Sequence, residues 1–323
     1  MSGAVCPRVV ALGGGHGLAA SLTALRRLTD QLTAVVTVAD DGGSSGRLRK
    51  ELGVLPPGDL RMALAALCRD DEWGRTWSEV IQHRFISSGE LHGHAVGNLL
   101  IVALWERLAG NPVAALDWVG RLLGAQGRVL PMSSVPLDIR ATVVGADGSP
   151  DAVTEVCGQV AVASTTGQVA GITLAPDQPP ACAEAVAAIY EADWVVLGPG
   201  SWFTSVLPHL LVPGLCEAIV GTRARRVVTL NLSAQTGETT GFSPETHLEV
   251  LAAHAPELRV DVVVADRGAV GDKTGLRRVA RALGAELVLD DVAAGDGLPR
   301  HDPERLAAAF DRVFSTHGQY GRI

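Results

Sequence analysis

The sequence predicts an α/β protein with a doubly wound, Rossmann-like and mostly parallel sheet that carries a helical insertion. Valine-rich apolar runs that end in glycines alternate with helical segments in both halves of the 323-residue chain. These runs are continuously apolar, which is typical of parallel strands covered on both faces. Between the halves, residues from about 56 to 125 carry helical periodicity and few strand signals. No repeat or linker divides residues 1–323, so we expect a single domain.

The first unit has the order strand, helix, strand. Residues 8–15, "RVVALGGG", form a β-branched run that ends in a glycine turn. Residues 17–28 have helical spacing, and residues 33–41, "TAVVTVADD", form a second buried strand that ends in two acids. Together they predict a βαβ unit.

The later elements return to the same alternation after a small antiparallel group. Val, Thr and Gly alternate between about residues 128 and 175, which predicts a few antiparallel strands. Strands are then predicted at 192–200, 224–233, 259–267 and 285–291, and helices at 201–219, 244–255, 275–284 and 302–314.

Composition excludes several classes of protein. The formal charge of −8 argues against broad binding to nucleic acid or to an anionic membrane, which needs a basic face. The five cysteines are scattered and form no C-x-x-C pair, so we expect neither a zinc site nor a disulfide framework. We find neither a signal peptide nor an apolar run of membrane-spanning length, so we expect a cytoplasmic protein without a membrane span.

Three glycine-rich segments follow predicted strands, and each is a candidate ligand loop. Where a strand is followed by glycines and a helix, the free backbone N–H groups at the helix N-terminus can bind a phosphate. The alternative is that each segment is a plain tight turn. Leu18 stands where a dinucleotide fingerprint would end in glycine, so NAD(P) is disfavoured. The candidate residues are Gly13, Gly14, Gly15, His16 and Gly17; Gly42, Gly43, Ser44, Ser45 and Arg47; and Gly198, Gly200, Ser201, Thr204 and Ser205.

The acids Asp40 and Asp41 stand directly before the second of these loops. They suit ribose or sugar hydroxyls, can hold a divalent cation or can orient a hydroxyl nucleophile, while a solvated turn is the alternative. Asp59 stands at a helix entry, as a capping residue or as a site residue. The sequence contains no firm metal site, and these three carboxylates are the candidates for a cation.

Two further polar residues complete the candidate site. Asn98 heads an apolar helix and is expected to reach into a pocket. Arg300 stands before the last helix, where its planar guanidinium suits a phosphate, although a surface position beside the helix cap at Asp302 is the alternative. The polar stretch after the strand at 224–233 is also typical of a functional loop.

The ordered set of motifs resembles the gluconeogenesis-factor family, the YvcK-like branch of the CofD-like proteins. His16 replaces a Thr that is usual in this family, and "SAQTGET" replaces the commoner "MTQPGET". The motifs that carry the resemblance are "ALGGGHGL", "VTVADDGGSSGRLR", "PPGDLRMALAAL", "GHAVGNLL", "LGPGSWFTSVLPHLLV", "NLSAQTGET" and "PRHDPERLA".

The resemblance implies a CofD-like, modified Rossmann fold and a cytoplasmic regulatory factor that is needed for gluconeogenic growth and for cell shape. It implies a UDP-sugar ligand, such as UDP-N-acetylglucosamine or UDP-glucose, with no required cofactor and no settled catalytic activity. The sister branch implies the alternative, a metal-dependent transfer of 2-phospho-lactate to a deazaflavin precursor. The sequence leaves open whether turnover occurs, whether a divalent cation binds, whether the chain forms a homo-oligomer and which proteins it meets.

Overall fold

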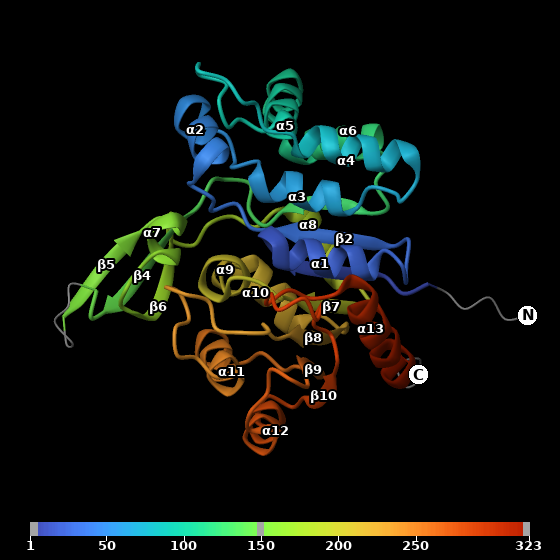
Figure 1. The fold of residues 1–323 in the computed structure, drawn as a ribbon, viewed down its shortest axis with the longest axis vertical. Helices are drawn as coiled ribbons and strands as arrows, with labels where there is room; N and C mark the ends of the chain where they lie inside the picture. The colour runs from blue at the N-terminus through green and yellow to red at the C-terminus, as the bar shows by residue number, and fades with distance from the viewer. Residues whose placement is uncertain (1–5, 147–151, 319–323) are drawn as a thin grey trace, which may run out of the picture.

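The computed structural model describes residues 6–146 and 152–318, and its centre is a seven-stranded sheet (Figure 1). All strand pairings in this sheet are parallel, which confirms the predicted fold class. Its strands run in the order β10-β9-β8-β7-β1-β2-β3. They are β1 (Val9–Gly13), β2 (Leu32–Val36), β3 (Arg128–Pro131), β7 (Trp194–Leu197), β8 (Arg225–Thr229), β9 (Val262–Asp266) and β10 (Glu286–Asp290).

The strand order reverses between β1 and β7. From β1 the chain builds outward through β2 to β3, and from β7 it builds in the opposite direction through β8 and β9 to β10. Doubly wound folds bind their ligands at such a reversal, beside the loops that leave the carboxyl ends of the two strands, here β1 and β7. The helices of these crossovers and the closing helix are α1 (Gly15–Leu25), α8 (Ala183–Glu191), α10 (Pro213–Gly221), α11 (Pro244–His254), α12 (Lys273–Ala282) and α13 (Pro303–Gly318).

The predicted helical insertion is present between β2 and β3. It packs over α1 through α3 and lies at the top of Figure 1. A further helix, α2 (Gly43–Leu52), precedes it. The insertion consists of α3 (Gly58–Ala66), α4 (Glu72–Gln82), α5 (Val96–Arg107) and α6 (Pro112–Leu123).

A second, three-stranded sheet projects from the side of the molecule (Figure 1). Its pairings are antiparallel, as predicted, although residues 128–131, at the start of the predicted antiparallel region, form β3 of the main parallel sheet. Residues 147–151 of the predicted segment lie outside the described residues. We call residues 138–175 the arm, which consists of β4 (Asp138–Val144), β5 (Val153–Cys157), α7 (Gln159–Ala163) and β6 (Gln168–Ala175).

Three predictions of local structure were wrong. The predicted strand at 33–41 ends at Val36, because its neighbour β1 ends opposite that residue at Gly13. The predicted loop at 42–46 is largely the first turn of α2, which has Gly42 as its N-cap residue, a position where Gly is accepted. The predicted helix at 201–219 is broken into η1 (Trp202–Val206), a π-helical turn, then α9 (Pro208–Leu211) and α10. Prolines begin both later pieces, and α8 is not among the predicted elements.

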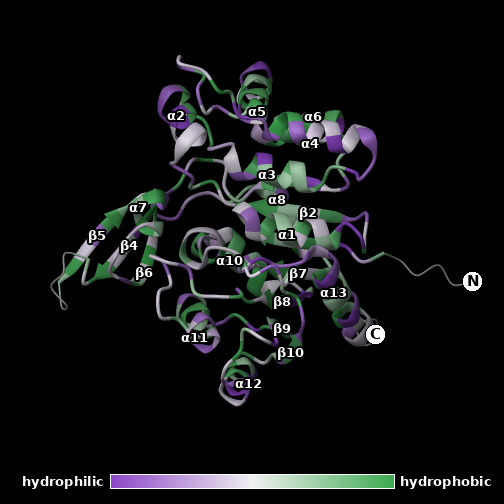
Figure 2. Cartoon of the chain, viewed as in Figure 1, coloured by the Kyte–Doolittle hydropathy of each residue, from purple (hydrophilic) through white to green (hydrophobic). Residues whose placement is uncertain are grey.

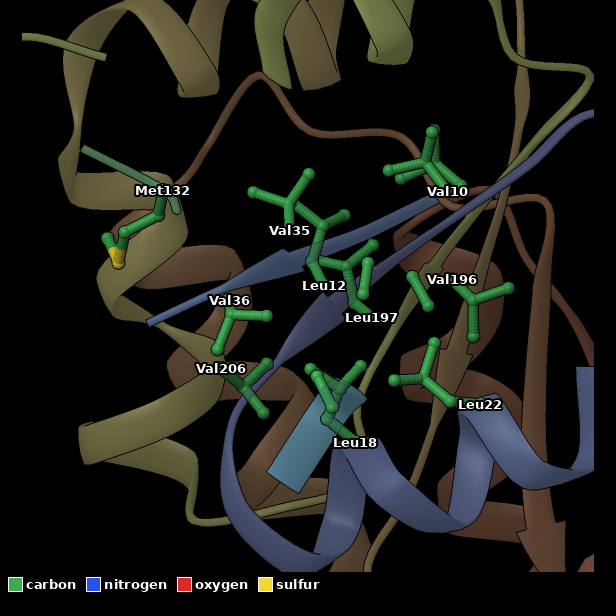
Figure 3. Packing of buried hydrophobic residues seen from close by; sticks show 14 of the residues in the cluster. Val10, Leu12, Leu18, Leu22, Val35, Val36, Met132, Val196, Leu197 and Val206 are labelled. Atoms are coloured by element: carbon green, nitrogen blue, oxygen red, sulfur yellow. The ribbon is translucent and has the colours of Figure 1, made fainter. Parts of the chain in front are cut away.

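The core is built from branched aliphatic side chains, in keeping with an aromatic content of only 4%. Figure 3 shows Leu18 and Leu22 of α1 directed toward the strands that carry Leu12 and Val196. Hydrophobic residues line the central strands, and hydrophilic ones gather on outward helices such as α12 (Figure 2). Among the described residues, no helix combines the length and apolar character needed to cross a membrane.

Replacing a core leucine of α1 tests how much this packing stabilises the fold. Leu22 is 0% exposed, so we expect Leu22→Ala to lower the free energy of unfolding by about 2–5 kcal/mol through lost burial and a residual cavity. Leu52→Ala is the matched control, because Leu52 is 44% exposed and its truncation should change stability little. Urea denaturation of both variants measures this, and equal losses would contradict the assignment of the core.

Candidate functional site

The loops at the carboxyl ends of β1, β7 and β8 enclose a pocket of about 350 Å³. It brings together four of the predicted ligand residues, which come from the start of α1, the loop after β7 and the segment before α13. A larger hollow, about 550 Å³, opens at the amino ends of β1 and β2 and contains none of the predicted residues. The walls of the smaller pocket include His16, Gly17, Pro199, Gly200, Asn231, Gln235, Arg300 and His301.

Two glycines of the first loop allow close packing within the protein. A β-carbon at Gly17 would lie 2.2 Å from the carbonyl oxygen of Pro199. One at Gly14 would lie 2.4 Å from Cγ2 of Thr37 and 2.6 Å from Oδ2 of Asp59. At these positions glycine therefore lets neighbouring protein segments approach, whereas the sequence interpretation assigned that role to a ligand. Exposed His16 remains free of this packing.

Asn231 fixes the glycine loop that follows β7. Its Oδ1 accepts the Gly200 N–H at 2.9 Å, and its Nδ2 donates to the Gly200 carbonyl at 2.8 Å. Gln235 Nε2 donates to Ser201 Oγ at 3.2 Å from the same polar loop. Sequence reasoning missed Asn231 because it assigned this residue to a strand, which in fact ends at Thr229. The sequence signal that could have identified Asn231 is its position directly after the apolar run at 227–230.

Asp59 and Asp40 lie together at the start of α3. Asp59 is buried and its Oδ2 has no hydrogen-bond partner. Burial, and next the charge of Asp40, raise the pKa of Asp59 to about 7, although the Gly15 N–H and the Arg61 guanidinium oppose the rise. A β-carbon on Gly58 would lie 2.7 Å from Oδ2 of Asp40 and 2.4 Å from Oγ of Ser45. These oxygens make a compact acidic cluster beside the first glycine loop.

Asp41 faces a different part of the molecule. Its Oδ1 accepts the backbone N–H of Val160 at 3.0 Å, and a β-carbon on Gly158 would lie 2.1 Å from its Oδ2. This carboxylate therefore binds the start of α7 in the arm. The structure thus separates the two acids that stand side by side in the sequence.

Asn98 belongs to a buried polar chain and does not line the pocket. Arg61 Nε donates to Asn98 Oδ1 at 2.9 Å, and Asn98 Nδ2 donates to Ser44 Oγ at 3.0 Å. Ser44 Oγ in turn lies 3.0 Å from Nδ1 of His94. Arg47, predicted as an anion ligand, donates instead to backbone carbonyls of the loop before α5. These residues hold α2 against the helical insertion.

Glu238 is a second buried acid, and sequence reasoning missed it. It is 3% exposed, and neither of its carboxylate oxygens has a hydrogen-bond partner. Burial raises the pKa of this carboxyl group to about 7, although the hydroxyl and N–H of Thr204, which lie near it outside hydrogen-bonding geometry, oppose the rise. Its neighbours Thr204 and Ser201 belong to the predicted set, and Ser205 of the same π-helical turn lies by Gly14. Its position in a long polar loop was the only signal.

Arg300 lines the pocket and pairs with a nearby acid. Its Nε donates to Oδ2 of Asp296 at 2.5 Å, and this hydrogen bond lowers the pKa of Asp296. Next to it, the buried Nε2 of His301 has no partner, and burial lowers the pKa of that imidazole to about 4. One wall of the pocket therefore carries a neutral imidazole and a guanidinium whose present partner is the carboxylate of Asp296.

Comparison with known proteins identifies the family. Residues 9–296 match the family model described as 2-phospho-L-lactate transferase CofD. A putative gluconeogenesis factor of Mycobacterium tuberculosis is 57% identical over 94% of this chain and 90% of that protein. A gluconeogenesis factor of Halalkalibacterium halodurans is 36% identical over 88% of this chain and 84% of that protein. The chain belongs to the gluconeogenesis-factor branch of the CofD-like family.

A solved structure supports the same family and fold. A crystal structure of a UPF0052-family protein from Bacillus halodurans superposes with a TM-score of 0.84 at 34% identity, covering 95% of this chain and 99% of that one. Within the described residues, no group of three or more His, Cys, Asp or Glu side chains is arranged to hold a metal ion. A cation in this family member would therefore need hydroxyl or ligand oxygens in addition to Asp40 and Asp59.

Asn231→Asp tests whether Asn231 fixes the loop after β7. The variant keeps the shape but loses the donor to the Gly200 carbonyl and places a carboxylate there, so we expect a loss of about 1–3 kcal/mol of unfolding free energy. Asn111→Asp is the matched control: Asn111 caps α6 through its Oδ1, and Asp caps equally well. Chemical denaturation compares the two, and equal small losses would show that the paired bonds of Asn231 are dispensable.

The pKa of Asp59 predicts a pH-dependent stability. Because the folded state raises this pKa from 3.8 to about 7, it binds the proton more tightly than the unfolded chain does. The free energy of unfolding should therefore fall as pH rises from about 4 to 7. Asp59→Asn removes this titration. Near pH 8 the free energy of unfolding of the variant should therefore exceed that of the wild type by about 2–4 kcal/mol, and near pH 4 the two values should be equal.

The measurement is urea denaturation across this pH range in the presence of a chelator. Asp311→Asn, at an exposed position on α13, is the control and should follow the wild-type profile. A constant difference between Asp59→Asn and wild type at all pH values would contradict the raised pKa.

Proposed function

We propose that this protein binds a UDP-sugar in the pocket at the carboxyl edge and acts as a cytoplasmic regulatory factor. The observation that carries the proposal is the convergence of a helix N-terminus, side-chain amides and Arg300 on one pocket at the reversal of strand order. Ligands of α/β proteins bind at such a reversal. The gluconeogenesis-factor names of its relatives support a role in gluconeogenic growth, and we extend it to cell shape.

The pocket offers suitable partners for each part of a nucleotide sugar. Helix α1 has no side-chain cap, so the N–H groups of its first turn and its positive dipole end suit a diphosphate. Arg300 would exchange Asp296 for phosphate oxygens, since a guanidinium binds both through paired hydrogen bonds. The amides of Asn231 and Gln235 suit ribose or sugar hydroxyls.

A divalent cation would fit between the acidic cluster and the diphosphate. Asp59 Oδ2 is buried without a partner, and Asp40 lies beside it, so a cation would supply the missing positive charge. Ser45 and phosphate oxygens would complete the hard oxygen ligands that Mg²⁺ prefers. Asp41 would not take part, because the arm occupies its Oδ1.

The description of the matching family model favours a second candidate, the transfer of 2-phospho-lactate. The acidic pair Asp40 and Asp59 would serve a metal-dependent transferase as well as a binding protein. We place this candidate second, because the relatives at 57% and 36% identity both carry the gluconeogenesis-factor name.

Calorimetric titration with UDP-N-acetylglucosamine and UDP-glucose, with and without Mg²⁺, tests the proposal, and chromatography then examines the recovered nucleotide. We expect binding and unchanged ligand. Absence of binding would contradict the binding site. Steady release of UDP or UMP, or formation of a phospho-lactyl deazaflavin from its donor, would contradict the regulatory function and support an enzyme.

Arg300→Ala provides a residue-level test. Loss of charge-assisted hydrogen bonds to the diphosphate, each worth roughly 1.5–3 kcal/mol, should weaken UDP-sugar binding about tenfold or more. Unliganded thermal stability should hardly change, because the side chain is exposed. Arg278→Ala on α12 is the control, since this exposed arginine is absent from the pocket walls. Equal dissociation constants for the two variants would exclude Arg300 from the site.

A further inference from the structure

The arm is joined to the loop that carries the predicted acids. Asp41 accepts the Val160 N–H at 3.0 Å, at the start of α7. Gly158, at φ +95°, leaves room for this contact, because a β-carbon there would lie 2.1 Å from Asp41 Oδ2. A β-carbon on Gly42 would likewise lie 2.8 Å from Cγ2 of Val160. The loop after β2 and the first turn of α7 therefore fit together without spare space.

Helix α2, which continues from this loop, grips the arm at a second point. Arg49 forms an ion pair with Asp138 at 2.9 Å and donates to the Leu137 carbonyl at 2.9 Å, both at the start of β4. The Arg49 side chain is 17% exposed and the Asp138 side chain is 50% exposed, so the pair lies at the edge of the protein surface with its guanidinium largely covered. Because the guanidinium is planar and donates to two neighbouring residues, the contact fixes the orientation of β4 against α2 as well as the distance between them.

The polar loop after β8 contacts the other end of α7. A β-carbon on Gly237 would lie 2.3 Å from the Ala163 carbonyl oxygen, and the φ of this glycine is +89°. The same loop carries Asn231 and Gln235, which bind Gly200 and Ser201. Helix α7 is thus held between the loop after β8, which lines the pocket, and the loop after β2, whose Thr37 lies against Gly14 of the first glycine loop.

We propose that Asp41 and Arg49 are positioning residues that couple the arm to the ligand loops, so that the arm responds to occupancy of the pocket. The inference rests on the proposed function, because it needs a ligand that orders these loops. A ligand that stabilises the present arrangement of both loops makes local unfolding of α7 and β4 rarer. Coupling is reciprocal, so a change on the arm that loosens α7 lowers the affinity of a pocket it does not touch.

Hydrogen exchange with saturating UDP-N-acetylglucosamine tests the coupling. In the wild type we expect exchange of amides in residues 137–146 and 158–164 to slow at least threefold, along with those of residues 13–17 and 198–205. Gly158→Ala breaks the contact from the arm side, since its β-carbon meets Asp41 Oδ2. In this variant the ligand should no longer slow exchange in the arm but should still slow exchange around residues 198–205. The affinity for UDP-N-acetylglucosamine should fall about threefold or more.

Asp138→Asn is a second arm-side variant with less risk to folding, and it should halve or abolish the slowing by weakening the Arg49 contact. Thr173→Ala, at an exposed position on β6 of the same arm, is the control and should behave as wild type. If the ligand slows exchange at 198–205 but not in the arm, or if both arm-side variants keep the wild-type response, the coupling is overturned and the proposed function stands. If calorimetry and exchange both show no binding, the proposed function fails and the inference fails with it.

Discussion

The contact between the start of α1 and the loop after β7 is the constraint on which the candidate site depends. Gly17 lies so close to Pro199 that no side chain can separate them. This contact joins the two halves of the doubly wound sheet where the strand order reverses. Because the loops meet there, His16 and Gly200 share one pocket, and the segment before α13 can close its wall with Arg300.

Buried acids on both sides of this contact give the site its electrostatic character. Asp59 lies under the first glycine loop, and Glu238 lies against the π-helical turn after the second. Burying carboxyl groups without partners costs stability, and carboxyl groups with raised pKa values cluster at functional sites. A bound cation, a proton or hydrogen-bond donors of a ligand would reduce this loss of folding free energy. The edge at which we propose that a diphosphate binds therefore also contains carboxyl groups whose pKa is raised by burial.

Hydrogen bonds and an ion pair around α2 hold the same edge of the sheet in place. The chain from Arg61 through Asn98 to Ser44 fixes α2 to the helical insertion, and Arg49 fixes it to the arm. Helix α2 therefore lies between two peripheral units and carries the acidic loop at its start. Residues that resemble ligand contacts in the sequence are used here to hold the loops in place.

The sequence by itself determined the parallel α/β class, the helical insertion and the family, because apolar periodicity and ordered glycine motifs are local properties of the chain. It also predicted that His16, Gly200 and Arg300 lie at the same edge of the sheet, and the three residues line one pocket. Only the tertiary structure separated Asp40 from Asp41, moved Asn98 and Arg47 into supporting contacts, and added Asn231 and Glu238. The physical reason is that the role of a polar side chain depends on which distant segment packs against its donors and acceptors in the folded protein. That choice is made by packing across the sheet, which no local pattern of residues encodes.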